Sequence, residues 1–127
     1  MEQLGLTTTG SRDYHLTARN IELVMLSKRI RIKLTNEQIR SLVQLMTHYI
    51  FHHPLISMQD KVTMFHLVKL ESSLRPQAFM PRGINLGLNI PQAQSLFQMF
   101  CDFNLQEHEY ETMLGNYIMG EIDHQIR

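Results

Sequence analysis

Two histidines with the spacing of metal ligands stand near the middle of the chain. His48 and His52 are four residues apart in a segment with helical periodicity, which places both imidazoles on one side of a helix. A zinc site needs a third or fourth ligand, and no H-E-x-x-H motif or cysteine pair supplies one. His48 and His52 are therefore candidate ligands for an alternative, metal-binding function, while the main prediction is a chain without metal or cofactor.

Two further features would matter for an enzyme. Glu121 and His124 form a single E-x-x-H segment, whereas carboxylate-bridged di-metal bundles use two such segments and two more glutamates. The one cysteine, Cys101, falls among apolar residues of a predicted helix, and we expect it to be a small buried side chain. The sequence contains no nucleophile elbow and no phosphate-binding glycine loop. It therefore predicts no catalytic residue and favours a function that is not enzymatic.

A cluster of basic residues indicates a second alternative, nucleic-acid binding. Such side chains can contact phosphates, but basic residues at the end of a helix also complement its dipole without any partner. The candidate residues for this alternative are Lys28, Arg29, Arg31, Lys33 and Arg40.

The composition fits one globular domain. The chain has 127 residues, of which 43% are hydrophobic, with twelve basic and twelve acidic side chains. The charges are divided unevenly, since residues 1–82 hold eleven basic and six acidic side chains and residues 83–127 hold one and six. The uncharged stretches at 41–59 and 83–101 carry too many polar groups for a membrane span. With a single cysteine and no secretory signal pattern, the sequence predicts a soluble, cytoplasmic protein without membrane contact.

The elements that would position these residues are mostly helical. We expect an all-α, single-domain bundle of about five helices, with a flexible arm at 1–15 and the helical domain at 16–127. The first helix is expected from Thr17 to about Lys33, although the alternation R-I-R-I-K-L at 29–34 also fits a short strand. Helix is preferred there because no second convincing strand is evident to pair with it.

The remaining helix boundaries follow from capping signals. Thr35 with Gln38, and Ser57 with Asp60, fit the pattern of N-terminal helix caps. The helix that begins after Thr35 is expected to end at Pro54, and the helix that begins after Ser57 is expected to end at Pro76. Residues 76–90 read as a long irregular loop between helices three and four. Helix four is expected to begin near Pro91, and Asn104 is a candidate cap for helix five.

The apolar spacing also predicts which faces are buried. In helix three the expected apolar series is Val62, Phe65 and Val68, with Leu74 as a candidate further member, and Glu71 and Arg75 are expected to form an exposed ion pair. The chain has nine methionines and no tryptophan, and methionines can form adaptable binding surfaces. Those expected at an interface are Met64, Met99 and Met119.

These patterns favour a function in protein–protein contact. Apolar residues nearly all round the first two predicted helices imply burial on more than one side, and a second chain would provide the extra cover. The leading hypothesis is therefore a small helical protein that binds a protein partner or forms a homo-oligomer. Nucleic-acid binding and metal binding remain as alternatives.

Overall fold

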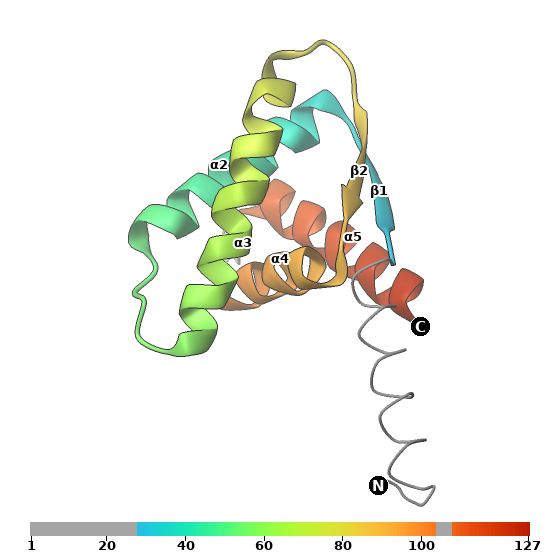
Figure 1. The fold of residues 1–127 in the computed structure, drawn as a ribbon. Coiled ribbons are helices and arrows are strands. Elements are labelled where there is room, and N and C mark those ends of the chain that lie inside the picture. Colours follow the sequence, from blue (N-terminus) through green and yellow to red (C-terminus); the bar gives the residue numbers. More distant parts are fainter. Residues whose placement is uncertain (1–27, 104–107) are drawn as a thin grey trace, which may run out of the picture.

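The computed structural model describes residues 28–103 and 108–127, which form helices packed on a small antiparallel sheet (Figure 1). Along the chain the elements are β1 (Ile30–Leu34), α2 (Asn36–His52), α3 (Met58–Leu74), the 3-10 helix η1 (Arg75–Phe79), β2 (Ile84–Leu88), α4 (Ile90–Asp102) and α5 (Glu109–Ile126). The predicted mainly helical class is confirmed. The arm at 1–15, most of the first predicted helix and the Asn104 cap lie outside the described residues.

The end of the first predicted helix is instead a strand. Ile30–Leu34 alternates buried and exposed residues, with Ile30 and Ile32 fully buried, and pairs antiparallel with β2 from Ile30 opposite Leu88 to Leu34 opposite Ile84. The preference for helix was wrong because it rested on the absence of a partner strand. The count of about five helices is not supported either, since the described residues contain four α-helices.

The partner strand lies in the segment that was expected to be an irregular loop. Residues 76–90 contain most of η1 and all of β2, so the long-loop prediction was wrong. Gly83 allows the chain to return beside β1, because a Cβ at this position would stand 2.4 Å from the carbonyl oxygen of Leu34. A segment rich in glycine and proline therefore contains β2, the second strand of the sheet.

The helix starts follow the predicted caps. The Thr35 hydroxyl accepts from the backbone N–H of Gln38 at 3.1 Å, while the Gln38 side chain accepts from the backbone N–H of Thr35 at 2.8 Å. Ser57 and Asp60 form the same reciprocal box at the start of α3. A third box, which the sequence reasoning missed, joins Asn89 to Gln92 and starts α4 at Ile90.

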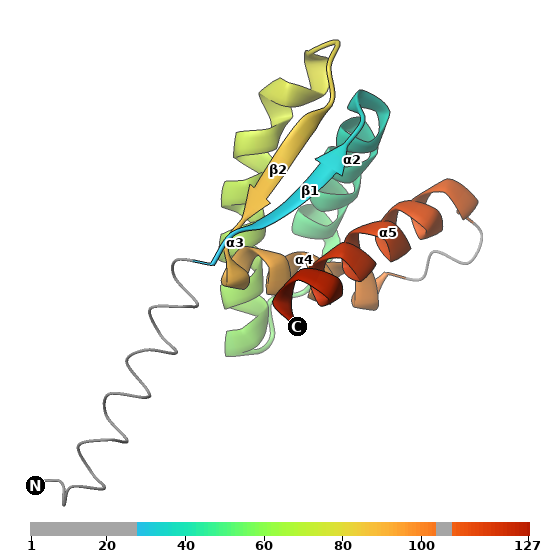
Figure 2. The same ribbon diagram turned by 90° about the vertical axis from the view of Figure 1, so that its right-hand side faces the viewer.

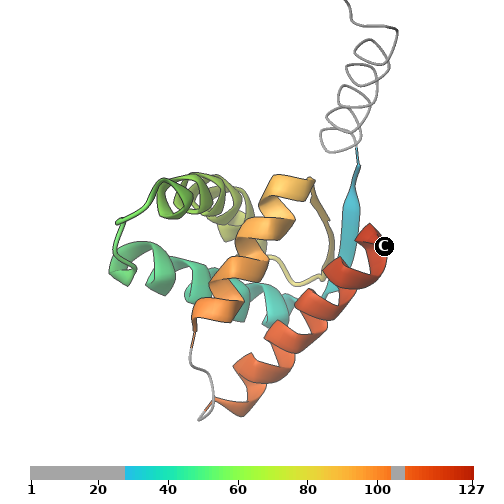
Figure 3. The same ribbon diagram turned by 90° about the horizontal axis from the view of Figure 1, so that it is seen from below.

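The helices arrange around one core. Seen from below, α4 lies between α3 and α5, and α2 runs alongside α3 and passes behind α4 (Figure 3). Fully buried side chains from both strands and all four α-helices form this core: Ile30, Ile32, Ile39, Leu42, Met46, Leu67, Leu88, Leu96, Met99 and Ile118. Among the described residues, no helix combines the length and apolar character needed to cross a membrane.

Several expectations about burial were wrong. Val62, Phe65 and Val68 are exposed, and α3 buries its opposite side with Met64, Leu67, Leu70 and Leu74. Met64 and Met99 therefore belong to the core and not to an interface, while Met119 is half-buried. Cys101 is exposed, because α4 turns Ser95 and Met99 toward the core in its place.

A glycine permits close packing between α4 and α5. A Cβ on Gly115 would lie 2.9 Å from Cδ1 of Phe100, which is closer than atoms in contact tolerate. The helix-weakening effect of glycine is thus offset by the approach of the aromatic ring.

Side chains of α5 close the outer edge of β1. The Gln125 amide accepts from the Arg31 backbone N–H at 2.8 Å and donates to the Arg31 carbonyl at 2.6 Å, as a neighbouring strand would. The Tyr117 hydroxyl donates to the Lys33 carbonyl at 2.8 Å. Figure 2 shows α5 beside β1, on the side away from β2.

Replacing Gln125 should loosen α5 from the sheet. Gln125→Leu removes both hydrogen bonds to Arg31, and we expect the free energy of unfolding to fall by about 1–3 kcal/mol, since each such bond contributes roughly 0.5–1.5 kcal/mol. Urea unfolding followed by circular dichroism measures the change. Gln94→Leu, an exposed position on α4, is the matched control. Equal stability of the two variants would contradict the role assigned to Gln125.

Candidate functional site

The most distinctive surface of the described chain is the side of α3 that faces away from the core. It presents Met58, Val62, Phe65 and Val68, whose exposed fractions are 73%, 44%, 56% and 42%. These positions recur every three or four residues, so they share one side of the helix. We call this set, with the exposed Lys61, the outer face of α3.

Further exposed apolar side chains precede α3 in the sequence. Phe51 at the end of α2, and Leu55 and Ile56 in the following loop, are exposed by 77%, 51% and 83%. Large exposed apolar patches mark contact sites more often than isolated exposed residues do. Lys69 lies with its ammonium 4.9 Å from the centre of the Phe65 ring, which adds positive charge beside the apolar centre.

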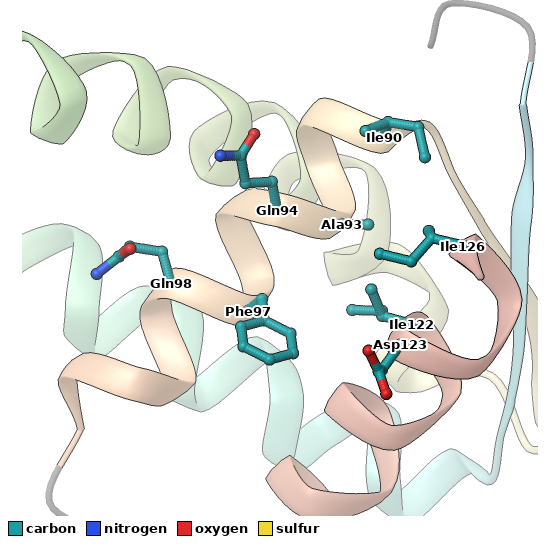
Figure 4. A pocket seen from close by; sticks show the side chains of 8 residues that line it. All are labelled: Ile90, Ala93, Gln94, Phe97, Gln98, Ile122, Asp123 and Ile126. Carbon is teal, nitrogen blue, oxygen red and sulfur yellow. The ribbon is translucent and has the colours of Figure 1, made fainter. Parts of the chain in front are cut away.

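A second apolar surface is a groove between α4 and α5. Its volume is about 410 Å³, and Figure 4 shows Phe97 of α4 across the groove from Ile122 and Ile126 of α5. Asp123 lies at the same groove, where Arg127 binds its carboxylate at 2.7 Å. The groove is thus an apolar depression with its carboxylate already paired.

The two candidate metal ligands lie together, but as stacked rings. The imidazole centres of His48 and His52 are 4.2 Å apart, and Nδ1 of His52 lies 2.8 Å from the carbonyl oxygen of His48. Within residues 28–103 and 108–127, no group of three or more His, Cys, Asp or Glu side chains could hold a metal ion. The sequence spacing therefore brings the two imidazoles together without a third ligand from the described part of the chain.

The candidate phosphate-binding residues occupy the exposed side of β1 and the first turns of α2. Arg31 and Lys33 share the outer side of the sheet with Asn85 and Gly87, their opposite neighbours in β2. Lys28 and Arg29 precede the strand and are also exposed. None of these four basic side chains forms an ion pair with another described residue, whereas the Arg40 guanidinium binds the Asn36 side chain.

A polar cluster ties together the ends of three helices. The Tyr49 hydroxyl donates to Asp102 at 2.5 Å, and the Tyr49 ring stacks on His53 with centres 4.4 Å apart. His53 Nε2 lies 3.3 Å from Asp60 and 4.0 Å from Asp102. Burial, together with the bond to Asp102, raises the pKa of Tyr49, so the phenol keeps its proton.

Asp60 links this cluster to the cap of α3. Its carboxylate accepts from the backbone N–H groups of Ser57 and Ile56 at 2.9 and 3.1 Å. The Ser57 N–H and the His53 side chain favour the ionised form and lower the pKa of Asp60 to about 2. The cluster therefore fastens the loop between α2 and α3 to the end of α4.

Glu71 was expected to be exposed, and the structure buries it. Only 3% of the residue is exposed, and its carboxylate accepts from the Thr47 hydroxyl at 2.8 Å and from Arg75 at 2.6 Å. The ion pair with Arg75 is present as predicted, although Arg75 alone reaches solvent. A buried carboxylate needs such partners, and here one comes from α2 and the other from the next turn of the chain after Glu71.

The sequence reasoning named none of these apolar surfaces as a site. The outer face of α3 was mistaken for core because α3 carries apolar residues on both sides. That two-sided pattern was the available signal, since a helix with apolar residues all round is covered on more than one side.

Comparison with known proteins adds no relative. No family model, curated protein or solved structure matches the chain. The inference of function therefore rests on the surfaces described above.

Asp60 should make the free energy of unfolding depend on pH in the acidic range. Because its folded pKa lies below the ordinary 3.8, ionised Asp60 stabilises the fold at neutral pH, and this contribution is lost as the pH falls toward 2. We expect Asp60→Asn to be less stable than wild type at pH 5 and the difference to shrink toward pH 2. Urea unfolding at several pH values tests this, with Glu109→Gln, an exposed carboxylate in α5, as the control. A constant difference across the range would contradict the assignment.

Proposed function

We propose that this chain acts through contact with other protein chains and that it associates with copies of itself. The observation that carries the proposal is the outer face of α3, where Met58, Val62, Phe65 and Val68 are exposed opposite the core side of the same helix. Leaving such a surface in water costs free energy that burial against another chain recovers. The proposal includes no catalytic step, and we place the protein in the cytoplasm, as expected from its single cysteine.

The pattern along α3 favours a second copy as the partner. Met58, Lys61, Phe65, Val68 and Ser72 follow the alternating three- and four-residue spacing of helices that pack side by side. In an antiparallel pair, Phe65 of one copy meets Val68 of the other, and Lys61 meets Ser72. A parallel pair would instead place Lys61 against Lys61, which is unfavourable. Antiparallel packing about a two-fold axis therefore buries the apolar centre without opposing like charges.

A charge at the centre of this face should weaken association. We expect Phe65→Asp to reduce it by about tenfold or more, because truncating a central aromatic residue and burying a carboxylate both oppose contact. Analytical ultracentrifugation over a range of concentrations, to tens of micromolar and above, measures the change in average mass. Met113→Asp, at an α5 position exposed by 66%, is the matched control.

The outcomes of this experiment separate the parts of the proposal. A wild-type protein that stays monomeric at all concentrations would contradict self-association. Unchanged association of Phe65→Asp would show that the outer face of α3 is not the contact surface.

The exposed basic side chains of β1 favour a second candidate function, nucleic-acid binding. Arg31 and Lys33 are free of ion pairs with the described residues and point to the same side of the sheet. This arrangement supports contact with phosphates more directly than the sequence cluster alone did.

Binding through these residues should depend steeply on salt. With two to four phosphate contacts, affinity for a labelled duplex should fall roughly ten- to a hundredfold between about 50 and about 200 mM salt. Fluorescence polarisation measures it, and the double variant Arg31→Glu, Lys33→Glu should abolish it. An affinity that is insensitive to salt, or retained by the double variant, would contradict this candidate.

A further inference from the structure

The two edges of the sheet differ in whether their outward backbone groups have hydrogen-bond partners. Gln125 binds both backbone groups of Arg31, and Tyr117 binds the carbonyl of Lys33, so three outward backbone groups of β1 have partners from α5. For β2, the described residues provide no such partner. An unpaired strand edge is a template for another strand, so this difference needs an explanation.

The register identifies which groups of β2 are unpaired. In an antiparallel pair, directly opposite residues either exchange both backbone hydrogen bonds or exchange neither. Arg31 and Lys33 direct their groups toward α5, so their opposite residues, Gly87 and Asn85, direct their own groups away from β1. No described residue forms a backbone hydrogen bond with Asn85 or Gly87 on that side.

The outer face of β2 is open at these two residues. Asn85 and Gly87 are both exposed, and a Cβ built on Gly87 would meet nothing within 4 Å. Leu86 and Leu88, between and after them, point into the core. The edge of β2 is therefore an extended segment with apolar residues on one side and small or polar ones on the other.

We propose that β2 pairs antiparallel with β2 of a second copy, which joins the two sheets into one four-stranded sheet. With the two-fold axis at Leu86, each Asn85 lies opposite Gly87 of the other copy, and both such pairs exchange their backbone hydrogen bonds. All the outward backbone groups of Asn85 and Gly87 then have partners.

Side chains fit this register as well. The Asn85 side chain faces a glycine across the new pair, so nothing obstructs it on the outer side. The two Leu86 residues are opposite each other in a pair without hydrogen bonds, where side chains approach most closely. Since α5 closes the β1 edge of each copy, strand addition stops at two copies.

This inference rests on the self-association in the proposed function but uses a different surface. Two separate two-fold contacts, one through α3 and one through β2, would build a tetramer or a longer chain. Phe65→Asp removes the first contact and leaves the second, so this variant should be a dimer.

A substitution at Gly87 tests the strand contact with a matched control. Gly87→Pro removes the outward N–H and no hydrogen bond to β1, because this group takes no part in pairing with β1, and proline is tolerated at strand edges. In the Phe65→Asp background we expect Gly87→Pro to raise the dimer dissociation constant by about tenfold or more. Gly87→Ala keeps the N–H and has space for its methyl group, so it should stay within about twofold of the parent.

Hydrogen exchange tests the same contact without any substitution at Gly87. In Phe65→Asp, the amides of Asn85 and Gly87 should exchange at least about tenfold more slowly at a concentration that forms dimer than at one that leaves monomer. The Leu86 amide faces β1 and should be protected at both concentrations, which provides an internal control.

The results distinguish this inference from the proposed function. If Phe65→Asp is monomeric while wild type associates, or if Gly87→Pro and Gly87→Ala form dimers equally well, the strand contact is overturned and the α3 contact stands. Concentration-independent exchange at Asn85 and Gly87 would also overturn it, even if the proline variant failed to fold. A wild-type protein that is monomeric throughout would overturn both.

Discussion

The pairing of β1 with β2 is the constraint on which the other contacts depend. It joins two segments that lie on opposite sides of α2 and α3 in the sequence, and so returns the chain to its starting point. Ile30, Ile32, Leu86 and Leu88 then present one apolar layer to the helices. Without this pairing, α4 would not start beside the sheet and α5 would have no strand edge to cover. The small sheet thus organises a mainly helical molecule.

The parts of the fold that could be predicted are those determined locally. The caps at Thr35 and Ser57 depend on residues three positions away, and both helices begin where these signals stand. The sheet depends on a distant partner, and β2 reads I-N-L-G-L, with asparagine and glycine that are uncommon in strands. The alternation at 29–34 was visible in the sequence, but a strand is stable only with a partner, which local reasoning did not supply.

The candidate site was harder to predict, for a related reason. Helical spacing shows which residues share a side, but α3 has apolar residues on both sides, and only the surrounding fold decides which side is buried. Once Leu67 and Leu70 face the core, Phe65 must face away. The burial of Glu71 has the same origin, because the core side of α3 includes its position and Thr47 and Arg75 provide partners. His48 and His52 could be placed together from spacing alone, and among the described residues no third ligand joins them.

The uneven charge of the chain takes on a different meaning in the folded structure. The basic strand β1 lies beside α5, which carries Glu121 and Asp123 near its C-terminal end. The hydrogen bonds between these two elements nevertheless come from the neutral side chains of Gln125 and Tyr117. Asp123, at the end of α5 that the helix dipole disfavours, is compensated by Arg127 one turn later. The charged side chains of Arg31 and Lys33 therefore form no ion pair that stabilises the described fold. Neutral hydrogen bonds fasten α5 to β1, which leaves the basic side chains and the β2 edge as separate surfaces for contact with other molecules.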